Sequence, residues 1–252
     1  REQLARNEAR LADIEIEVTC ASIRTLINGD NRVILERFLD KHPDTFIVID
    51  EAHHSAARTY RQLLEVADRH ESVDVLGLTA TPMRSAERER GAIAKLFPDG
   101  IIYEADMSTL ISRSVLARPH MHVVETGEEI VLEASERTHL EQFSDYSPQT
   151  LERLASSMSR NRLIVEHYLA NETAYGPTLV FATNVAHAMT LAEQFQAQGI
   201  AADYVTHVVE PGHSPVHTIL ADFQAGRTKV LTSVTKLTEG IDLPNAQAVL
   251  LA

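Results

Sequence analysis

The chain carries the stretch Thr-Phe-Ile-Val-Ile-Asp-Glu-Ala-His at residues 45–53. Its first five residues are apolar or β-branched, which predicts a β-strand buried on both faces, as in a parallel sheet. Two carboxylates, Asp50 and Glu51, follow that strand directly. In open α/β sheets, ligands bind beyond the carboxyl ends of the strands. An aspartate there can hold Mg²⁺, and a glutamate beside it can orient or deprotonate an attacking water.

A second polar strand end supports this interpretation. Taken alone, two acids after an apolar strand indicate a solvated strand end or a helix cap more often than a site. The run Leu-Gly-Leu-Thr-Ala-Thr-Pro at residues 76–82 follows them after one predicted helix and one predicted strand. It places Thr79 and Thr81 at the next carboxyl end, where their hydroxyls can link that loop to the acids by hydrogen bonds.

The rest of the chain alternates β-rich runs with helical stretches, which predicts an α/β fold with parallel sheets. Strands are expected at residues 45–49, 73–78, 178–182, 200–205, 229–233 and 246–251, with a weaker pattern for a strand at 120–126. Helices are expected at residues 60–68, 87–97, 151–169, 185–198 and 216–225. We therefore expect two α/β units, at residues 1–115 and 173–252, joined by a partly helical connection at 116–172.

Composition narrows the class of protein. Hydrophobic residues make up 44% of the 252 residues and charged residues 23%, as in globular proteins. No apolar run approaches the roughly 18 residues that a membrane span needs, and residues 1–10 carry no secretory signal. Cys20 is the only cysteine, which fits a reducing cytoplasm, and we expect it to be a small buried side chain. The formal net charge of −13 argues against nucleic-acid binding by the whole surface but permits a local groove.

Several segments together resemble a known family. The tetrad Asp-Glu-Ala-His at residues 50–53 resembles the Walker B motif of DEAD/DEAH-box superfamily 2 helicases, and residues 78–82 are similar to their motif III. Residues 178–183 resemble motif IV, residues 230–244 resemble motif V, and residues 19–26 resemble the segment before Walker B that touches the nucleic-acid backbone. The motifs occur in family order over nearly the whole chain. The strings GLTATP and LTEGIDLP are most similar to the group of type III restriction subunits and DNA-repair helicases.

The resemblance implies two RecA-like parallel-sheet units that bind ATP and Mg²⁺ and move along nucleic acid, with DNA favoured over RNA. It implies that Asp50 and Glu51 hold the metal, that Glu51 is the catalytic base, and that His53 couples the nucleotide site to motif III. The nucleotide contacts that it implies are Thr79, Thr81, Gly240 and Asp242. The phosphate contacts with nucleic acid that it implies are Thr19, Ser22, Thr183 and Thr238. For any single one of these four hydroxyls, a plain turn or strand-end role is nearly as well supported.

Two expected motifs are absent from the 252 residues. There is no Gly-x-x-x-x-Gly-Lys-Ser/Thr loop, which cradles the phosphates in this family, and no Gln-x-x-Gly-Arg-x-x-Arg motif, which supplies an arginine finger. We therefore expect the first unit to be incomplete, the chain to be an internal fragment of a longer helicase, and the chain alone to be inactive as an ATPase. Because the net charge is negative, we also expect other segments or a protein partner to supply basic surface.

Two alternatives remain open beside a helicase or translocase. The parent protein could be the translocating subunit of a restriction enzyme, which a nuclease domain elsewhere in it would reveal. Or the fold could be a degenerate helicase that binds nucleic acid or protein without catalysis. The adjacent Asp50 and Glu51 disfavour the second alternative, because a site without catalysis has no need of two juxtaposed acids.

Overall fold

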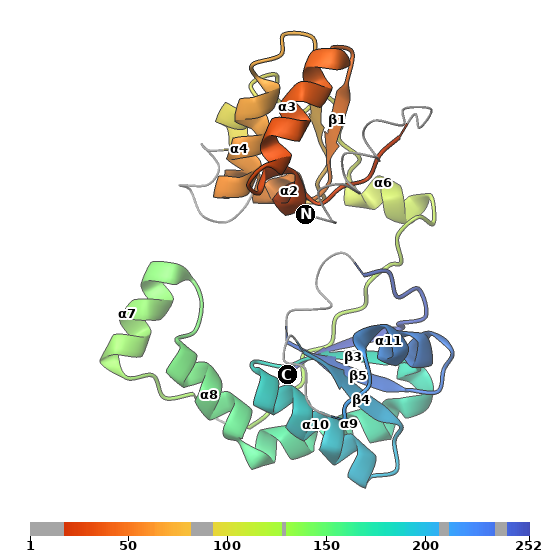
Figure 1. The fold of residues 1–252 in the computed structure, drawn as a ribbon. Coiled ribbons are helices and arrows are strands. Elements are labelled where there is room, and N and C mark those ends of the chain that lie inside the picture. Colours follow the sequence, from red (N-terminus) through yellow and green to blue (C-terminus); the bar gives the residue numbers. More distant parts are fainter. Residues whose placement is uncertain (1–17, 82–92, 128–129, 207–211, 235–240) are drawn as a thin grey trace. The chain divides into compact units, whose positions relative to one another are not determined.

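A computed structural model describes residues 18–81, 93–127, 130–206, 212–234 and 241–252 (Figure 1). The chain divides into two compact units, one ending at Pro119 and the other beginning at His120. Each unit is an α/β structure whose strands are parallel, so the predicted fold class is confirmed. No helix among these residues is long and apolar enough to cross a membrane.

The first unit contains a two-stranded parallel sheet. Strand β1 (Phe46–Ile49) pairs with β2 (Asp74–Gly77), with Phe46 opposite Asp74 and Ile49 opposite Gly77. Its helices are α2 (Ile23–Ile27), α3 (Asn31–Lys41), α4 (Arg58–Ala67) and α6 (Met107–Ser112), and a 3₁₀ helix, η1 (Ala52–Ala56), follows β1. Both strands and α4 confirm the sequence predictions. The helix predicted at residues 87–97 lies largely outside the described residues, of which residues 93–96 are helical.

The core of the first unit lies on one side of β1. Buried side chains from α2, α3 and α4 pack around Ile49 and Ala52. Phe46 and Val48, which alternate with Ile47 and Ile49, are 58% and 51% exposed. The prediction that β1 is buried on both faces is therefore wrong, because successive side chains point to opposite faces and the described helices pack against only one of them. Cys20 was expected to be buried, and it is exposed.

The second unit contains a four-stranded parallel sheet of order β4-β5-β3-β6. Its strands are β3 (Thr178–Phe181), β4 (Ala202–Val205), β5 (Val230–Ser233) and β6 (Ala248–Leu251). Its helices are α7 (Ala134–Phe143), α8 (Pro148–Ser156), α9 (Met158–Tyr175), α10 (Val185–Ala197) and α11 (Val216–Gln224). All four strands lie inside their predicted ranges, and α10 and α11 confirm the predicted helices.

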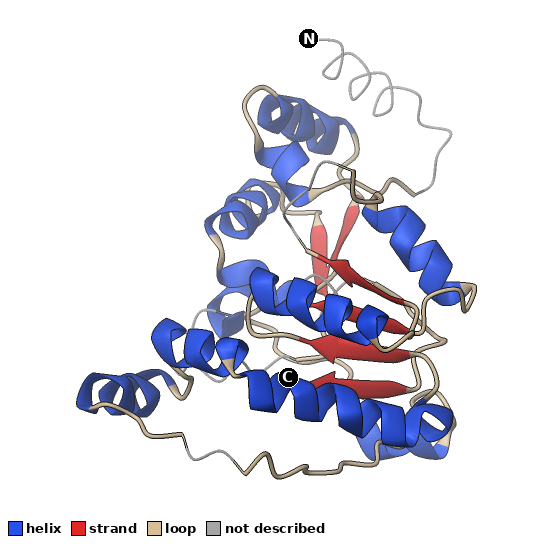
Figure 2. Ribbon diagram, turned by 90° about the horizontal axis from the view of Figure 1, so that it is seen from below, coloured by secondary structure: helices blue, strands red, loops and turns tan. Residues whose placement is uncertain are grey.

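Helices cover both faces of this sheet (Figure 2). On one face, Val180 and Val230 pack in one cluster with buried side chains of α9 and α10. Their neighbours Leu179 and Leu231 pack with Ile219 and other residues of α11 in a second cluster. Because side chains alternate along a strand, the two clusters lie on opposite faces. Burial on both sides thus explains the near-continuous apolar sequence of β3 and β5, as expected of parallel strands.

Two predictions for residues 116–172 are wrong. Residues 120–126 form no strand, and the apolar Met121 and Val123 are almost fully exposed, so no layer buries the alternating side chains that made this segment resemble a strand. The helix predicted over residues 151–169 is two helices, α8 and α9. They part at Ser157, whose main chain is extended and whose hydroxyl accepts the Arg160 N–H at 3.2 Å. Serine competes for main-chain hydrogen bonds in this way and favours helix starts.

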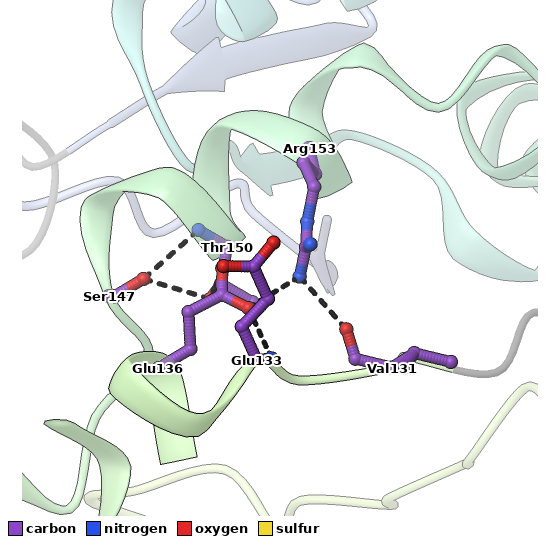
Figure 3. Close-up of polar contacts among 6 residues, drawn as sticks. All are labelled: Val131, Glu133, Glu136, Ser147, Thr150 and Arg153. Atoms are coloured by element: carbon purple, nitrogen blue, oxygen red, sulfur yellow. Dashed lines mark hydrogen bonds and ion pairs between the residues drawn. The ribbon is translucent and has the colours of Figure 1, made fainter. Parts of the chain in front are cut away.

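A buried carboxylate joins α7 to α8 (Figure 3). Glu136 accepts hydrogen bonds from the Glu133 main-chain N–H, the Thr150 hydroxyl and the Arg153 guanidinium, each at 2.9 Å. These donors, the Glu133 N–H first, hold the pKa of Glu136 below its ordinary value. The ionised, fully partnered carboxylate fixes α7 against α8 as a helical hairpin, because moving either helix would leave a buried charge without its donors.

Candidate functional site

The ends of β1 and β2 are held together beyond the strands themselves. The Leu78 N–H donates to the Ile49 carbonyl at 2.8 Å, and the Ala52 N–H donates to the Leu78 carbonyl at 2.8 Å. Main-chain hydrogen bonds thus continue from the parallel sheet into the turn that carries the acidic pair. The residues after both strands are therefore neighbours, as the shared carboxyl edge of a parallel sheet requires.

His53 connects the two strand ends through its side chain. The ring is buried, and its Nδ1 lies 3.2 Å from Glu51 Oε2 and 3.0 Å from Thr79 Oγ1. Thr79 Oγ1 also accepts the Thr81 N–H at 3.0 Å. Because an ionised carboxylate can only accept, the contact with Glu51 is a hydrogen bond when Nδ1 carries the proton. The structure thus brings Glu51, His53, Thr79 and Thr81 into one connected group.

The acidic pair lies in a strained turn. Glu51 has φ 50° and ψ 45°, the left-handed region that costs a residue with a side chain on the order of 1–2 kcal/mol. Asp50 is exposed, and its Oδ1 accepts the Glu51 N–H at 2.9 Å. Such a conformation persists only where its surroundings hold it, here the Ala52 main-chain bond and the His53 contact. Glu51 remains partly exposed, so its carboxylate can reach a bound molecule.

These donors suit a particular kind of metal. Mg²⁺ is usually held by one or two carboxylates together with waters and substrate phosphates, rather than by a cage of protein ligands. Asp50 and Glu51 offer that minimal set. Among the residues that the structure describes, no group of three or more His, Cys, Asp or Glu could hold a metal ion. The site therefore fits a magnesium ion that shares its coordination with phosphate oxygens.

Small side chains let the two motifs approach each other. A Cβ added at Gly77 would lie 2.8 Å from Ala52 Cβ and 2.9 Å from Phe97 Cζ. Ala52 is itself buried in the core of the first unit. The glycine before the hydroxyl residues and the alanine inside the acidic tetrad therefore form one close contact, which sets the distance between the two strand ends.

Replacing Gly77 with alanine is expected to lower the free energy of unfolding of the first unit by about 1–3 kcal/mol, because the added methyl overpacks this contact. Hydrogen exchange of the amides in residues 46–52, followed through denaturant unfolding, measures the change. In the Gly77→Ala, Ala52→Gly double variant, the loss should be smaller than the sum of the two single losses, since one methyl replaces the other. Wild-type stability of Gly77→Ala would contradict this account.

The remaining residues singled out in the sequence lie in other elements. Thr19 is exposed, and Ser22 caps α2, where its hydroxyl accepts the Thr25 N–H at 3.2 Å. Thr183 follows β3 in the second unit. Asp242 is exposed in that unit, and its carbonyl accepts from the Gln224 side chain at 3.2 Å. Thr238 and Gly240 lie outside the described residues.

One further residue, His187, was not predicted from the sequence. The ring is 2% exposed, and its Nδ1 lies 3.0 Å from Thr183 Oγ1. Burial first, and the positive charge of Arg160 second, lower its pKa to about 4. The available signal was its position four residues after a motif hydroxyl, in the first turn of a helix, where a ring can fold back on the strand end.

Two family models match the chain. The model of the type III restriction enzyme res subunit matches residues 2–84, and the model of the helicase C-terminal domain matches residues 166–252. The first match contains the group around His53, and the second contains Thr183 and Asp242. The two strand-end regions described above thus belong to two separately recognised modules.

Individual proteins match over most of the chain. A Saccharomyces cerevisiae protein, IRC3, described as an ATP-dependent helicase, is 29% identical over 95% of this chain and 33% of its own length. A Schizosaccharomyces pombe protein, irc3, described as a mitochondrial ATP-dependent helicase, is 30% identical over 91% of this chain and 35% of its own length. The solved structure of S. cerevisiae Dbp5 bound to RNA and ADP BeF3 matches with a TM-score of 0.48 and 16% identity, covering 81% of this chain and 43% of that one. The chain spans about a third of the length of the two curated relatives.

Proposed function

Since the chain belongs to the ATP-dependent helicases, in the group of type III restriction subunits and DNA-repair helicases, we propose that its protein couples ATP hydrolysis to movement along nucleic acid. The proposal places this chain in superfamily 2, with residues 50–53 as its DEAH box. The observation that carries it is the contact of His53 Nδ1 with both Glu51 and Thr79. That contact joins a carboxylate able to activate water to the loop of the neighbouring strand.

Each residue of this group has a distinct task in the proposed reaction. Asp50 and Glu51 would hold Mg²⁺, which neutralises charge on the phosphates of ATP when it is bound. Glu51 would orient the attacking water and take its proton. His53 would couple a change at the Glu51 carboxylate to the position of Thr79, because its Nδ1 contacts both side chains. Thr81, bonded through its N–H to Thr79 Oγ1, would keep that loop in place beside the nucleotide.

Residues of the second unit would also contact the nucleotide and the nucleic acid. Gly240 and Asp242 would approach ATP from that unit. Thr19, Ser22, Thr183 and Thr238 would contact phosphates, since hydroxyls position a nucleic-acid backbone without reading bases. The match to a restriction-enzyme subunit supports DNA over RNA as the strand, because restriction enzymes act on DNA. The net charge of −13 supports a further basic surface from other segments or a partner protein.

Nucleic-acid-stimulated ATP hydrolysis tests the proposal. We expect the whole protein to release phosphate from ATP in a Mg²⁺-dependent reaction that single-stranded DNA accelerates more than RNA of the same length. We expect the 252-residue chain alone to release none, since it carries no phosphate-cradling loop. Hydrolysis by the chain alone would contradict the second expectation. Strand binding without hydrolysis by the whole protein would favour a non-catalytic binding module instead.

The family match to residues 2–84 favours one second candidate, the translocating subunit of a restriction enzyme. The same site would then drive translocation toward a cleavage event. Incubation of the whole protein with ATP, Mg²⁺ and long duplex DNA separates the two candidates. Double-strand cleavage that requires ATP would favour the restriction subunit, and strand separation without cleavage would favour the repair-type helicase.

A further inference from the structure

His187 makes hydrogen bonds with both of its ring nitrogens. It lies in the first turn of α10, where its main-chain N–H donates to Asn184 Oδ1 at 2.8 Å. Its Nδ1 faces Thr183, at 3.0 Å from Oγ1 and 3.3 Å from the main-chain nitrogen. Its Nε2 lies 2.9 Å from Asn161 Oδ1. The ring therefore bridges the end of β3 and helix α9.

The partners determine which nitrogen carries the proton. Asn161 donates through Nδ2 to the Ala155 carbonyl at 2.8 Å, so its Oδ1 is the atom that faces His187. A carbonyl oxygen can only accept, so Nε2 must be the protonated nitrogen. Nδ1 is then an acceptor with a single lone pair. The pKa of about 4 keeps the ring in this neutral form at neutral pH.

Thr183 offers two donors to that one lone pair. Its main-chain N–H and its hydroxyl both lie within hydrogen-bond distance of Nδ1. If the N–H occupies Nδ1, the hydroxyl proton can rotate about the Cβ–Oγ bond toward another acceptor. No main-chain movement is needed for this exchange. A phosphate oxygen is an acceptor that a hydroxyl can bind in this way.

We propose that His187 is a positioning residue for nucleic-acid binding: it accepts the Thr183 N–H and so holds the main chain of Thr183 where the hydroxyl can donate to a backbone phosphate. The inference rests on the proposed function, which places Thr183 against the strand. Asn161, anchored on Ala155 at the end of α8, holds the ring in the required orientation. His187 thus acts on the strand through Thr183 and does not touch it.

Two substitutions separate the two ring nitrogens. In asparagine, Oδ1 is as many bonds from Cα as Nδ1 of histidine, so His187→Asn keeps an acceptor for Thr183 and loses the bond to Asn161. In glutamine, the amide nitrogen is as many bonds from Cα as Nε2, so His187→Gln keeps the bond to Asn161 and loses the acceptor. The two variants thus differ in whether Thr183 keeps an acceptor for its main-chain N–H, whatever each variant does to stability.

The measurement is the affinity of the full protein for fluorescent single-stranded oligothymidylate, by anisotropy at constant salt, with thermal unfolding of each variant beside it. We expect His187→Asn to bind within about twofold of wild type, and His187→Gln about tenfold more weakly, the equivalent of one lost charge-assisted hydrogen bond. Thr183→Val should weaken binding by a similar factor, and Thr183→Ser should not. Adding His187→Gln to Thr183→Val should cause no further loss.

Several results would overturn the inference. Equal weakening by His187→Asn and His187→Gln, or losses that add in the double variant, would show that His187 does not act through Thr183. Losses that follow thermal stability would show a purely structural role. If wild type binds but Thr183→Val binds equally well, this inference fails while the helicase function stands. If wild type does not bind oligothymidylate at all, both the inference and the proposed strand binding are wrong.

Discussion

Replacing Glu51 with glutamine is expected to slow ATP hydrolysis by the whole protein by about 10²–10⁴-fold while leaving ATP binding unchanged. An amide has the shape of the carboxylate but cannot take a proton from water. The strained turn should persist, because glutamine has the same main-chain requirements as glutamate at φ 50°. Phosphate release measures hydrolysis, and a fluorescent ATP analogue measures binding.

A matched control keeps this test specific. Glu71 is an exposed carboxylate before the start of β2, whereas the site lies after the ends of β1 and β2. Glu71→Gln therefore makes the same chemical change elsewhere in the first unit. Its hydrolysis rate should equal that of wild type. Near-normal turnover by Glu51→Gln would remove Glu51 from the catalytic role. Loss of both binding and hydrolysis would instead show that the substitution disturbs the fold.

Acidification from pH 7 to pH 4 is expected to cost the second unit about 3 kcal/mol of stability through His187 alone. Its pKa is about 4 in the folded protein, against 6.5 ordinarily. Between these values the unfolded chain binds a proton that the folded ring refuses, so stability is complete above pH 6.5 and declines as the pH falls toward 4. Each pKa unit corresponds to about 1.4 kcal/mol. Denaturant unfolding across this pH range measures the decline.

The His187→Asn variant isolates this contribution, because asparagine does not titrate. Its stability should fall less steeply over the same range than that of wild type. Other groups, such as Glu136 with its lowered pKa, also weaken the fold on acidification, but they are common to both proteins and cancel in the difference. Parallel pH profiles for the two proteins would show that His187 is not a buried neutral ring.

The strands were the most predictable part of the fold. β-branched and apolar runs identified all six described strands, because such a run of four or five consecutive residues is typical of a strand whether one of its faces is buried or both. Helix boundaries in residues 116–172 were not predictable in the same way. Periodicity continues across Ser157, and only its extended main chain, held by the Arg160 N–H, divides α8 from α9. The hairpin of α7 and α8 depends on Glu136 finding donors up to 17 residues away.

The sequence correctly predicted that the acidic pair and the two threonines, Thr79 and Thr81, lie at neighbouring strand ends, because parallel strands end at one edge of a sheet. What each residue does there remains a proposal. Their geometry was beyond the sequence: neither the left-handed turn at Glu51 nor the close contact of Gly77 with Ala52 has a local signature. Both depend on how near two strands lie, which the packing of the whole unit sets.

The sequence by itself determined where each motif begins, in what order the motifs come, and that the acids of residues 50–53 follow a strand. Those properties are carried by neighbouring residues. Only the tertiary structure decided that His53 meets Thr79 and that His187 meets Asn161, pairs that are each 26 residues apart. It also decided the protonation of His187, because the charge state of a ring depends on burial and on the atoms facing it in space. Residues that are neighbours in the sequence thus identify the groups of the site, and tertiary packing sets the distances between those groups.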